Sequence, residues 1–298
     1  MPSLREMRLR IRSVGNIAQV TRALEAVSAS KVRRAQQAAL ATRAYATKAW
    51  SVLEDLAGQP GSGRLHRLLD RRPEVRQVLV VMVSGDRGLA GAYNVNVVRE
   101  VLARFRSSPV PVRYLVVGRK GRDMMLRRGA HLAAEFSGLP GLPTFADVSA
   151  IGRLALEDFE KGQADEVYLA YTRFISLVRQ EVVVRRLLPL AVEEMGAHMQ
   201  TMGARPSGPR PAYIFEPGRA QLLDEIVPRF AALQVFQAIL ESLASEHAAR
   251  MVTMRNATEN AHELTATLKL DYNKARQQSI TGDLLDIAGG AEALAARA

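Results

Sequence analysis

The sequence contains no cysteine, only five histidines and one tryptophan, and 5% aromatic residues in a chain of 298. The lack of cysteine excludes disulfide bonds, thiolate metal sites and cysteine nucleophiles. The histidines are scattered and give no metal-ligand spacing. No run approaches the roughly 20 apolar residues of a membrane span, and the charged N-terminus has no apolar signal core. We therefore expect a protein that stays in its compartment of synthesis, either soluble or peripheral to a membrane.

Basic residues are distributed unevenly along the chain. The formal net charge is +11, of which residues 1–57 carry +6, residues 58–216 carry +7 and residues 217–298 carry −2. Such a balance fits an acidic protein partner or nucleic acid. The first segment has neither interleaved aromatic residues nor a basic region followed by a zipper. The pattern therefore favours a solvated face that also contacts acidic protein.

The N-terminal segment is predicted to form one long helix. Only Gly15 interrupts residues 3–57, and Ser3 with Glu6 matches a capping box. Large apolar residues recur at steps of three and four, but the step from Val14 to Ile17 is three where the alternation calls for four. We interpret this fault as a stammer, which overwinds a coiled coil locally. The predicted seam consists of Leu4, Met7, Ile11, Val14, Ile17, Val20, Leu24 and Val27.

The C-terminal segment is predicted to form a second long helix. Sixteen seam positions from Leu223 to Ala275 keep one register, with alternating steps of three and four. His247 lies on this seam, where we expect it to pack or to form a hydrogen bond between helices. Because the two helices lie at opposite ends of the chain, we expect an antiparallel coiled coil.

Residues 58–216 are predicted to form an inserted Rossmann-like α/β domain. The continuous apolar runs 78–83 (VLVVMV) and 112–117 (VRYLVV) are typical of strands covered on both faces, and residues 95–105 form a helix between them. Residues 166–172 and 181–188 are expected to be a hairpin or neighbouring strands. The predicted fold class is α/β, with domains at residues 1–57, 58–216 and 217–298.

Residues 84–94 (SGDRGLAGAYN) lie where doubly wound sheets bind phosphates, after a strand and before a helix. Their glycines match neither the dinucleotide fingerprint nor the phosphate loop, and Asp86 would repel an anion. We interpret the segment as a structural turn, and residues 118–121 (GRKG) as a solvated helix start. No acid–base pair, catalytic triad or metal cluster emerges, so we expect no catalytic residue, cofactor or metal.

Several segments, in order over nearly the whole chain, resemble the gamma subunit family of F-type ATP synthases, the central rotor shaft. They are residues 11–36, 84–94, 171–174, 187–190, 244–261 and 272–281 (YNKARQQSIT). The resemblance implies a coiled coil inside a hexamer of alpha and beta subunits. It also implies a foot, formed by the α/β domain with the epsilon subunit, on the membrane ring of c subunits.

The resemblance further implies a role in coupling. Transmembrane proton flow turns ring and shaft, and the beta subunits change their nucleotide affinity in sequence to make ATP; the coupling ion, proton or sodium, stays open. The chain itself would be non-catalytic, with no small-molecule substrate and no nucleic-acid partner. It would lie peripherally at the cytoplasmic face of a bacterial plasma membrane.

The resemblance assigns contact roles to a few residues. Arg250, Gln277 and Thr281 fall where the shaft hydrogen-bonds a loop of a beta subunit, and an arginine there supplies charge-assisted donors to a carboxylate. Lys31, Arg33 and Arg34 fall near the height of an acidic beta segment. Without the resemblance, all are more simply solvated residues of a coiled-coil surface.

Two alternatives from other classes compete with this interpretation. A soluble α/β enzyme with helical arms would bind a small ligand at residues 84–94. A basic coiled-coil protein would bind nucleic acid, with an affinity that falls steeply as salt rises.

Overall fold

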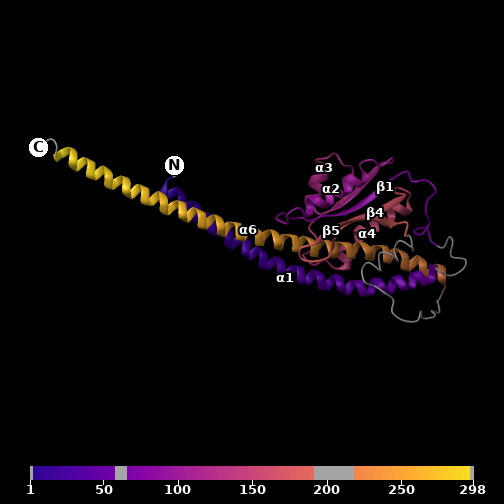
Figure 1. Ribbon diagram of the computed structural model, residues 1–298. Coiled ribbons are helices and arrows are strands. Elements are labelled where there is room, and N and C mark those ends of the chain that lie inside the picture. Colours follow the sequence, from indigo (N-terminus) through magenta and orange to yellow (C-terminus); the bar gives the residue numbers. More distant parts are fainter. Residues whose placement is uncertain (1–2, 58–65, 191–217, 296–298) are drawn as a thin grey trace. The chain divides into compact units, whose positions relative to one another are not determined.

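A computed structural model describes residues 3–57, 66–190 and 218–295. Figure 1 shows two long helices and an α/β body. The helices are α1 (Leu4–Ala57), α2 (Tyr93–Phe105), α3 (Arg119–Leu126), α4 (Phe145–Glu160) and α6 (Arg219–Ala295). The strands are β1 (Val78–Val83), β2 (Val112–Val117), β3 (Leu132–Phe136), β4 (Glu166–Phe174) and β5 (Gln180–Leu188).

The chain divides into two compact units, and both long helices run through both of them. Unit 1 comprises Met1–Val27 with Met251–Ala298, and unit 2 comprises Ser28–Arg250. The predicted domain limits differ from this division: α1 ends at Ala57, whereas residues 191–217 lie outside the described residues. A domain boundary at residues 216–217 therefore stays a prediction.

Unit 2 contains a five-stranded sheet in the order β3-β2-β1-β4-β5. The first four strands are parallel and β5 is antiparallel to β4, so the expected α/β class and the expected hairpin are confirmed. β1 and β2 have the predicted bounds, because their apolar runs are buried on both faces. β3 and α4 were not predicted. In β3 half-buried and exposed residues alternate over only five positions, which leaves a weak sequence pattern.

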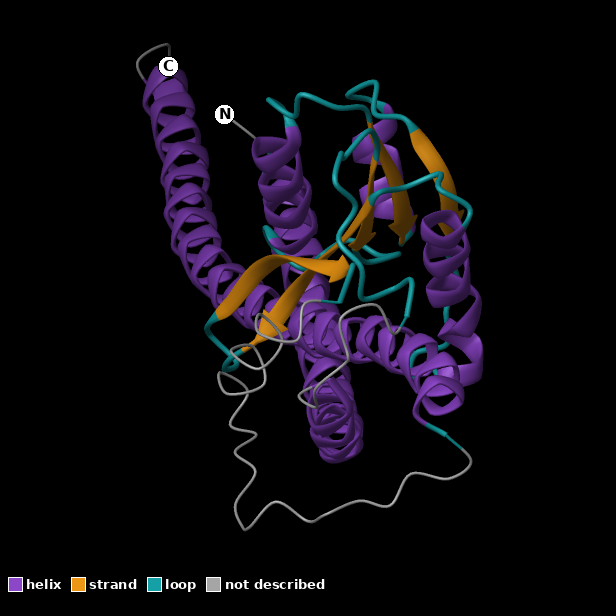
Figure 2. Ribbon diagram, turned by 90° about the vertical axis from the view of Figure 1, so that its right-hand side faces the viewer, coloured by secondary structure: helices purple, strands orange, loops and turns teal. Residues whose placement is uncertain are grey.

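Helices cover both faces of the sheet (Figure 2). α2 and α3 pack on one face through a cluster that includes Val97, Val101 and Met125. The other face packs against α4, α6 and the end of α1, with Phe159, Phe230 and Trp50 in one cluster. The approach of α4 to α6 is close, since a Cβ on Gly152 would lie 3.1 Å from the Ala232 Cα atom. Only glycine fits there without a shift of one helix.

α6 is buried on nearly all sides between Phe230 and Arg250, because sheet, α4 and α1 surround it. It is the one described helix that is long and apolar enough to span a membrane, with a mean hydropathy of 1.2 in its most apolar window. However, 72% of that window is buried within the protein. A core helix has this composition for the same physical reason as a membrane helix, namely that its surroundings are apolar.

The predicted seam of α6 is confirmed in full. All sixteen positions from Leu223 to Ala275 are buried or half-buried. In unit 1, Thr21 Oγ1 lies 2.7 Å from Thr258 Oγ1, and the Arg8 guanidinium donates to the Tyr272 hydroxyl at 2.6 Å. Residue numbers rise along α1 as they fall along α6, so the pair is antiparallel as expected. In unit 2, Trp50 near the end of α1 packs against Phe230 near the start of α6, with ring centroids 5.9 Å apart. This contact also agrees with an antiparallel arrangement.

The predicted stammer in α1 is wrong. Ile17, Val20 and Val27 are each more than half exposed. The buried and half-buried positions of the seam instead continue with alternating steps of three and four, without a fault. They are Leu4, Met7, Ile11, Val14, Ala18, Thr21, Glu25, Ser28, Val32, Ala35, Ala39, Thr42 and Ala46. The predicted seam is therefore right as far as Val14; beyond it the sequence interpretation followed the largest apolar side chains, whereas the helix presents mostly small ones to its partner.

This corrected seam predicts unequal effects at two neighbouring residues. Ala18 is 3% exposed, so Ala18→Leu should force α6 away and lower the free energy of unfolding by about 1–3 kcal/mol. Ile17→Ala should change it by less than about 0.5 kcal/mol, because that side chain faces solvent. Urea unfolding followed by the helical circular-dichroism signal measures both. If Ile17→Ala lowered the free energy of unfolding more than Ala18→Leu does, the result would support the stammered seam instead.

Candidate functional site

The loop between β1 and α2, residues 84–94, is closed at its start by Ser84. The Ser84 hydroxyl donates to the Val117 carbonyl at 2.8 Å and accepts from the Gly121 amide at 3.0 Å. A Cβ on Gly121 would lie 2.3 Å from Ser84 Oγ, and Gly118 has a φ of +97°. The glycines of residues 118–121 are therefore required by backbone conformation and by contact with Ser84. This confirms the interpretation of GRKG as a helix start.

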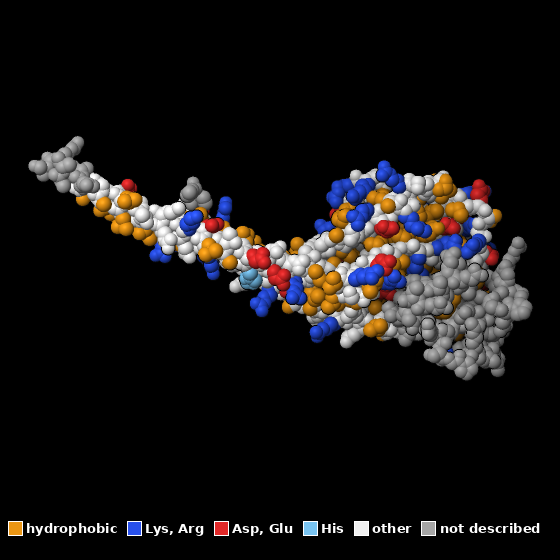
Figure 3. All heavy atoms as spheres, in the orientation of Figure 1, with side chains coloured by type: hydrophobic (Ala, Val, Ile, Leu, Met, Phe, Trp, Pro, Cys, Tyr) orange, Lys and Arg blue, Asp and Glu red, His pale blue; other side chains and the backbone are white. Residues whose placement is uncertain are grey.

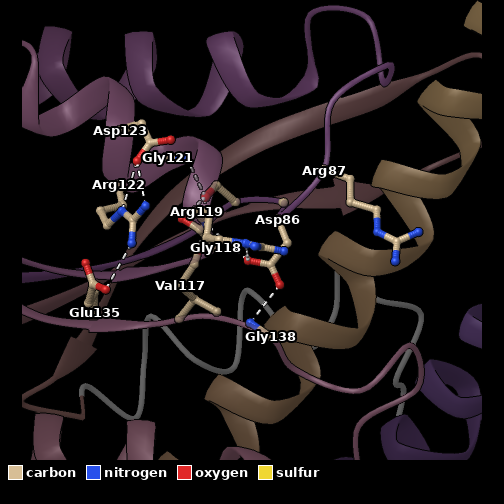
Figure 4. A network of polar contacts seen from close by, with 12 residues as sticks. Asp86, Arg87, Val117, Gly118, Arg119, Gly121, Arg122, Asp123, Glu135 and Gly138 are labelled. Atoms are coloured by element: carbon tan, nitrogen blue, oxygen red, sulfur yellow. Dashed lines mark hydrogen bonds and ion pairs between the residues drawn. The ribbon is translucent and has the colours of Figure 1, made fainter.

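Asp86 occupies the place of an anion at the start of α3. Its carboxylate accepts from the Arg119 amide at 3.0 Å and from the Gly138 amide at 2.8 Å. Figure 4 shows this carboxylate pointing toward both groups, while Arg87 points away from the network. A helix N-terminus favours negative charge because its amides are unpaired and its dipole is positive. The chain satisfies these amides with its own carboxylate, and a phosphate at the same point would meet a negative charge.

α6 lies across the edge of the sheet at which β1 and β4 end. The Thr172 amide donates to Ser242 Oγ at 3.1 Å, and the Ser245 hydroxyl donates to the Thr172 carbonyl at 3.0 Å. The Glu246 carboxylate lies against Gly85, where an added Cβ would come within 2.7 Å of it. In doubly wound sheets, ligands bind where the strand order reverses, which here is between β1 and β4. Side chains of α6 fill that position.

Arg250 joins α6 to the loop. Its guanidinium forms a buried ion pair with Glu246, donates from Nε to the Gly88 carbonyl at 3.3 Å, and lies 3.1 Å from His247 Nδ1. Removing one partner of a buried pair costs several kcal/mol, because the other charge is left without compensation. Leu89 follows Gly88 with a φ of +61° and an exposed side chain. The loop therefore has a fixed base and an exposed tip.

His247 is buried and neutral. A guanidinium can only donate, so His247 Nδ1 accepts and the ring proton is on Nε2. Burial, together with the charges of Arg250 and Lys31, lowers the pKa of His247 to about 4. His247 is buried on the seam as expected, but its hydrogen bond is to Arg250 of the same helix rather than to a residue of α1.

No group of three or more His, Asp or Glu side chains within residues 3–57, 66–190 and 218–295 could hold a metal ion. The site is an arrangement of a loop, a sheet edge and a helix.

Comparison with known proteins identifies the family. Residues 3–294 match the ATP synthase family. The ATP synthase gamma chain of Dehalococcoides mccartyi is 45% identical over 296 residues, which cover 99% of this chain and 100% of that protein. The chain belongs to the ATP synthase gamma chain family. The gamma chains of a Roseiflexus species and of Chloroflexus aurantiacus are 44% and 41% identical, each over 99% of both chains.

Solved structures agree on the fold of this gamma chain. A chain of the central stalk and c-ring of the Tetrahymena thermophila mitochondrial ATP synthase has a TM-score of 0.61 at 24% identity, covering 80% of this chain and 99% of that one. A chain from the Euglena gracilis mitochondrial ATP synthase has a TM-score of 0.66 at 21% identity, covering 98% and 94%. The long helices with an inserted sheet are thus a known arrangement.

The residues singled out by the family resemblance lie in different units of the gamma chain. Arg250 is buried in unit 2, at 9% exposure, whereas Gln277 and Thr281 are exposed on α6 in unit 1. Lys31 is half-buried in unit 2, and Arg33 and Arg34 are exposed there. Arg250 and Lys31 both lie close to His247, while Gln277 and Thr281 lie one turn apart on the same helix face.

Sequence reasoning missed the residues that seat α6 on the sheet. Ser242, Ser245 and Glu246 are buried at 7% exposure or less and each contacts the sheet edge or the loop. One pattern pointed to them: polar residues recur within a stretch of helix that is otherwise largely apolar. Their partners are the backbone of Thr172 and of Gly85, so the types of the partner residues could not have indicated these contacts.

The neutral state of His247 predicts a pH dependence of stability. The unfolded ring has a pKa of about 6.5 and the folded ring one of about 4, so protonation favours the unfolded chain. The contribution is fully present above pH 6.5 and is lost as pH falls toward 4, by up to about 1.4 kcal/mol per pH unit. His247→Gln, which keeps an acceptor for Arg250, should remove that slope. Urea unfolding followed by the fluorescence of Trp50 at several pH values measures the difference, and parallel curves for both proteins would contradict it.

Proposed function

We propose that this chain is the central rotor subunit of an F-type ATP synthase and couples transmembrane proton flow to conformational change in the catalytic beta subunits. The observation that carries the proposal is the match to gamma chains over 99% of this chain and the whole length of the relative. Its partners would be the alpha and beta hexamer, the epsilon subunit and the membrane c-ring. The rotor would be peripheral, at the cytoplasmic face of a bacterial plasma membrane.

A non-catalytic role agrees with the chemistry of the chain. The edge of the sheet that would bind a ligand is filled by Glu246 and its helix, and the start of α3 is satisfied by Asp86. An enzyme with helical arms would need that space for a substrate. The reaction would therefore occur on other subunits, and this chain would transmit force.

Gln277 and Thr281 are suited to contact a beta subunit directly. Among the described residues, the last hydrogen bond between the two helices of unit 1 joins Arg8 to Tyr272. Gln277 and Thr281 lie beyond it, and both side chains are exposed. Their amide and hydroxyl groups are free to bond without disrupting the pair of helices.

Further along α6, apolar side chains are exposed. Leu284, Leu285 and Ile287 are each more than 60% exposed. A cluster of this kind is stable in water only at a cost, which a surrounding protein sleeve would remove. A rotor inside a hexamer meets this need.

Arg250 would act in a different way from Gln277 and Thr281. Three of the five N–H donors of a guanidinium are used by Glu246, His247 and Gly88. The remaining donors supply the proposed contact with a beta loop, while the used ones hold residues 84–94. The exposed Arg33 and Arg34, with the half-buried Lys31 beside them, supply positive charge for an acidic beta segment.

Co-expression with alpha, beta and epsilon subunits tests the proposal. We expect a complex of three alpha, three beta, one gamma and one epsilon subunit on affinity purification, the stoichiometry that the family implies. Purification of this chain as a stable, monodisperse monomer in the presence of those subunits would overturn the proposal.

The contact residues give a second, quantitative prediction. The double variant Gln277→Ala, Thr281→Ala should lower ATP turnover of the assembled complex roughly fivefold per lost hydrogen bond, since each is worth about 1 kcal/mol. The double variant Gln278→Ala, Ser279→Ala alters exposed neighbours on other faces of the same helix and is the matched control. Equal turnover by the two variants would contradict the assigned roles.

A further inference from the structure

The positive charge of unit 2 is concentrated in one stretch of the chain. Residues 93–130, which run from α2 through β2 to α3, contain nine basic and two acidic residues. The net +7 of this stretch equals the net charge of all residues 58–216, so the rest of that segment is balanced. Figure 3 shows Lys and Arg side chains gathered over α2 and α3.

Four of these arginines define what we call the arginine edge: Arg104, Arg106, Arg127 and Arg128. α2 and α3 follow the parallel strands β1 and β2, so both helices end at the edge where the strands begin. The two helices contact each other, which brings their last turns together. All four side chains are exposed.

The arginine edge is not neutralised within the protein. None of its four members forms an ion pair within residues 66–190. Asp158 pairs with Arg113 and Glu166 pairs with Arg186, so these two carboxylates are already used. Asp123 and Glu135 both pair with Arg122.

Favourable contact with helix ends accounts for only part of this charge. A helix C-terminus carries about half a negative charge, so the ends of α2 and α3 balance about one of the four cations. The Arg128 guanidinium donates to the Met124 carbonyl, which is an interaction of this kind. About three positive charges remain for a partner.

We propose that the arginine edge docks on an anionic phospholipid surface. Guanidinium groups bind phosphate in a bidentate manner, and clusters of four to eight basic residues are attracted to an anionic leaflet. A protein interface of comparable strength needs an apolar or aromatic centre, whereas Leu126 is the one large apolar side chain of α3 that is exposed. The inference rests on the proposed function, which brings unit 2 close to a membrane ring.

Vesicle co-sedimentation of the full chain tests the inference. We expect binding to vesicles that contain phosphatidylglycerol and none to vesicles of phosphatidylcholine alone, at about physiological salt. Each basic residue near an anionic surface raises binding about fivefold. Replacement of all four members of the arginine edge by glutamine should therefore weaken binding by roughly 600-fold, nearly three orders of magnitude.

A matched control separates this edge from net charge. Arg5, Arg10, Arg12 and Arg22 are exposed on α1, and their replacement by glutamine lowers the net charge of +11 by the same four units. This control variant should lose far less binding. An equal loss in both variants would overturn the proposal, as would a wild-type chain that does not bind the anionic vesicles.

Two further arms test the other classes of partner. If the wild-type chain bound double-stranded DNA more tightly than vesicles, and the glutamine variant did not bind DNA, the partner of the arginine edge would be nucleic acid and not lipid. If the glutamine variant failed to assemble with alpha, beta and epsilon subunits, the partner would be an acidic protein. Vesicle binding needs no other subunit, so a chain that does not bind vesicles leaves the rotor proposal intact. The rotor proposal is tested separately, by whether the wild-type chain assembles with the other subunits.

Discussion

The structure of unit 2 depends on the attachment of α6 to the edge of the sheet where β1 and β4 end. Two serines exchange hydrogen bonds with the backbone of Thr172, and Glu246 lies on Gly85. These bonds are directional, so they fix both the rotation and the axial position of the helix in a way that apolar packing alone does not. The buried Glu246–Arg250 pair then extends the attachment to the Gly88 carbonyl. A helix that has to transmit force needs such an attachment, because a purely apolar contact without directional bonds would allow the helix to slide along the sheet.

The pair of long helices uses a different kind of contact. From Ala18 onward, its seam on α1 consists largely of alanine, serine and threonine, so the backbones approach closely, while Ile17, Val20 and Val27 remain outside. The hydrogen bond between Thr21 and Thr258 satisfies two hydroxyl groups within this seam. Buried polar groups carry a penalty when they lose their partner, so a shift of register is disfavoured although the apolar content of the seam is low. Close approach and satisfied polar groups together give a thin, stiff pair.

The predictability of this fold follows the strength of each pattern. Val78–Val83 and Val112–Val117 could be placed to the residue because runs buried on both faces have sharp ends. The α6 seam could be read because its register never changes. The α1 seam could not, since apolar size suggested Ile17 where close packing selects Ala18. The repulsive role of Asp86 was visible from its charge, whereas its bonds to Arg119 and Gly138 depend on where two distant loops end. Glu246 was visible as a residue, but its role depends on the backbone of Gly85.

The same reasoning explains why so few aromatic residues suffice. Aromatic anchors strengthen fixed interfaces, because a large rigid side chain fills one pocket and releases slowly. In the described residues, the aromatic contact of Trp50 with Phe230 lies in the core of unit 2, whereas that of Phe145 with Phe236 lies nearer its surface. The exposed part of α6 beyond Tyr272 instead presents aliphatic, amide and hydroxyl groups, together with the charged side chains of Lys274, Arg276, Asp283 and Asp286. A surface of this composition binds weakly at many angles, which is what a shaft needs if it is to pass one beta subunit after another. The molecule thus concentrates strong, directional contacts at the sheet and leaves weak ones along the part that turns.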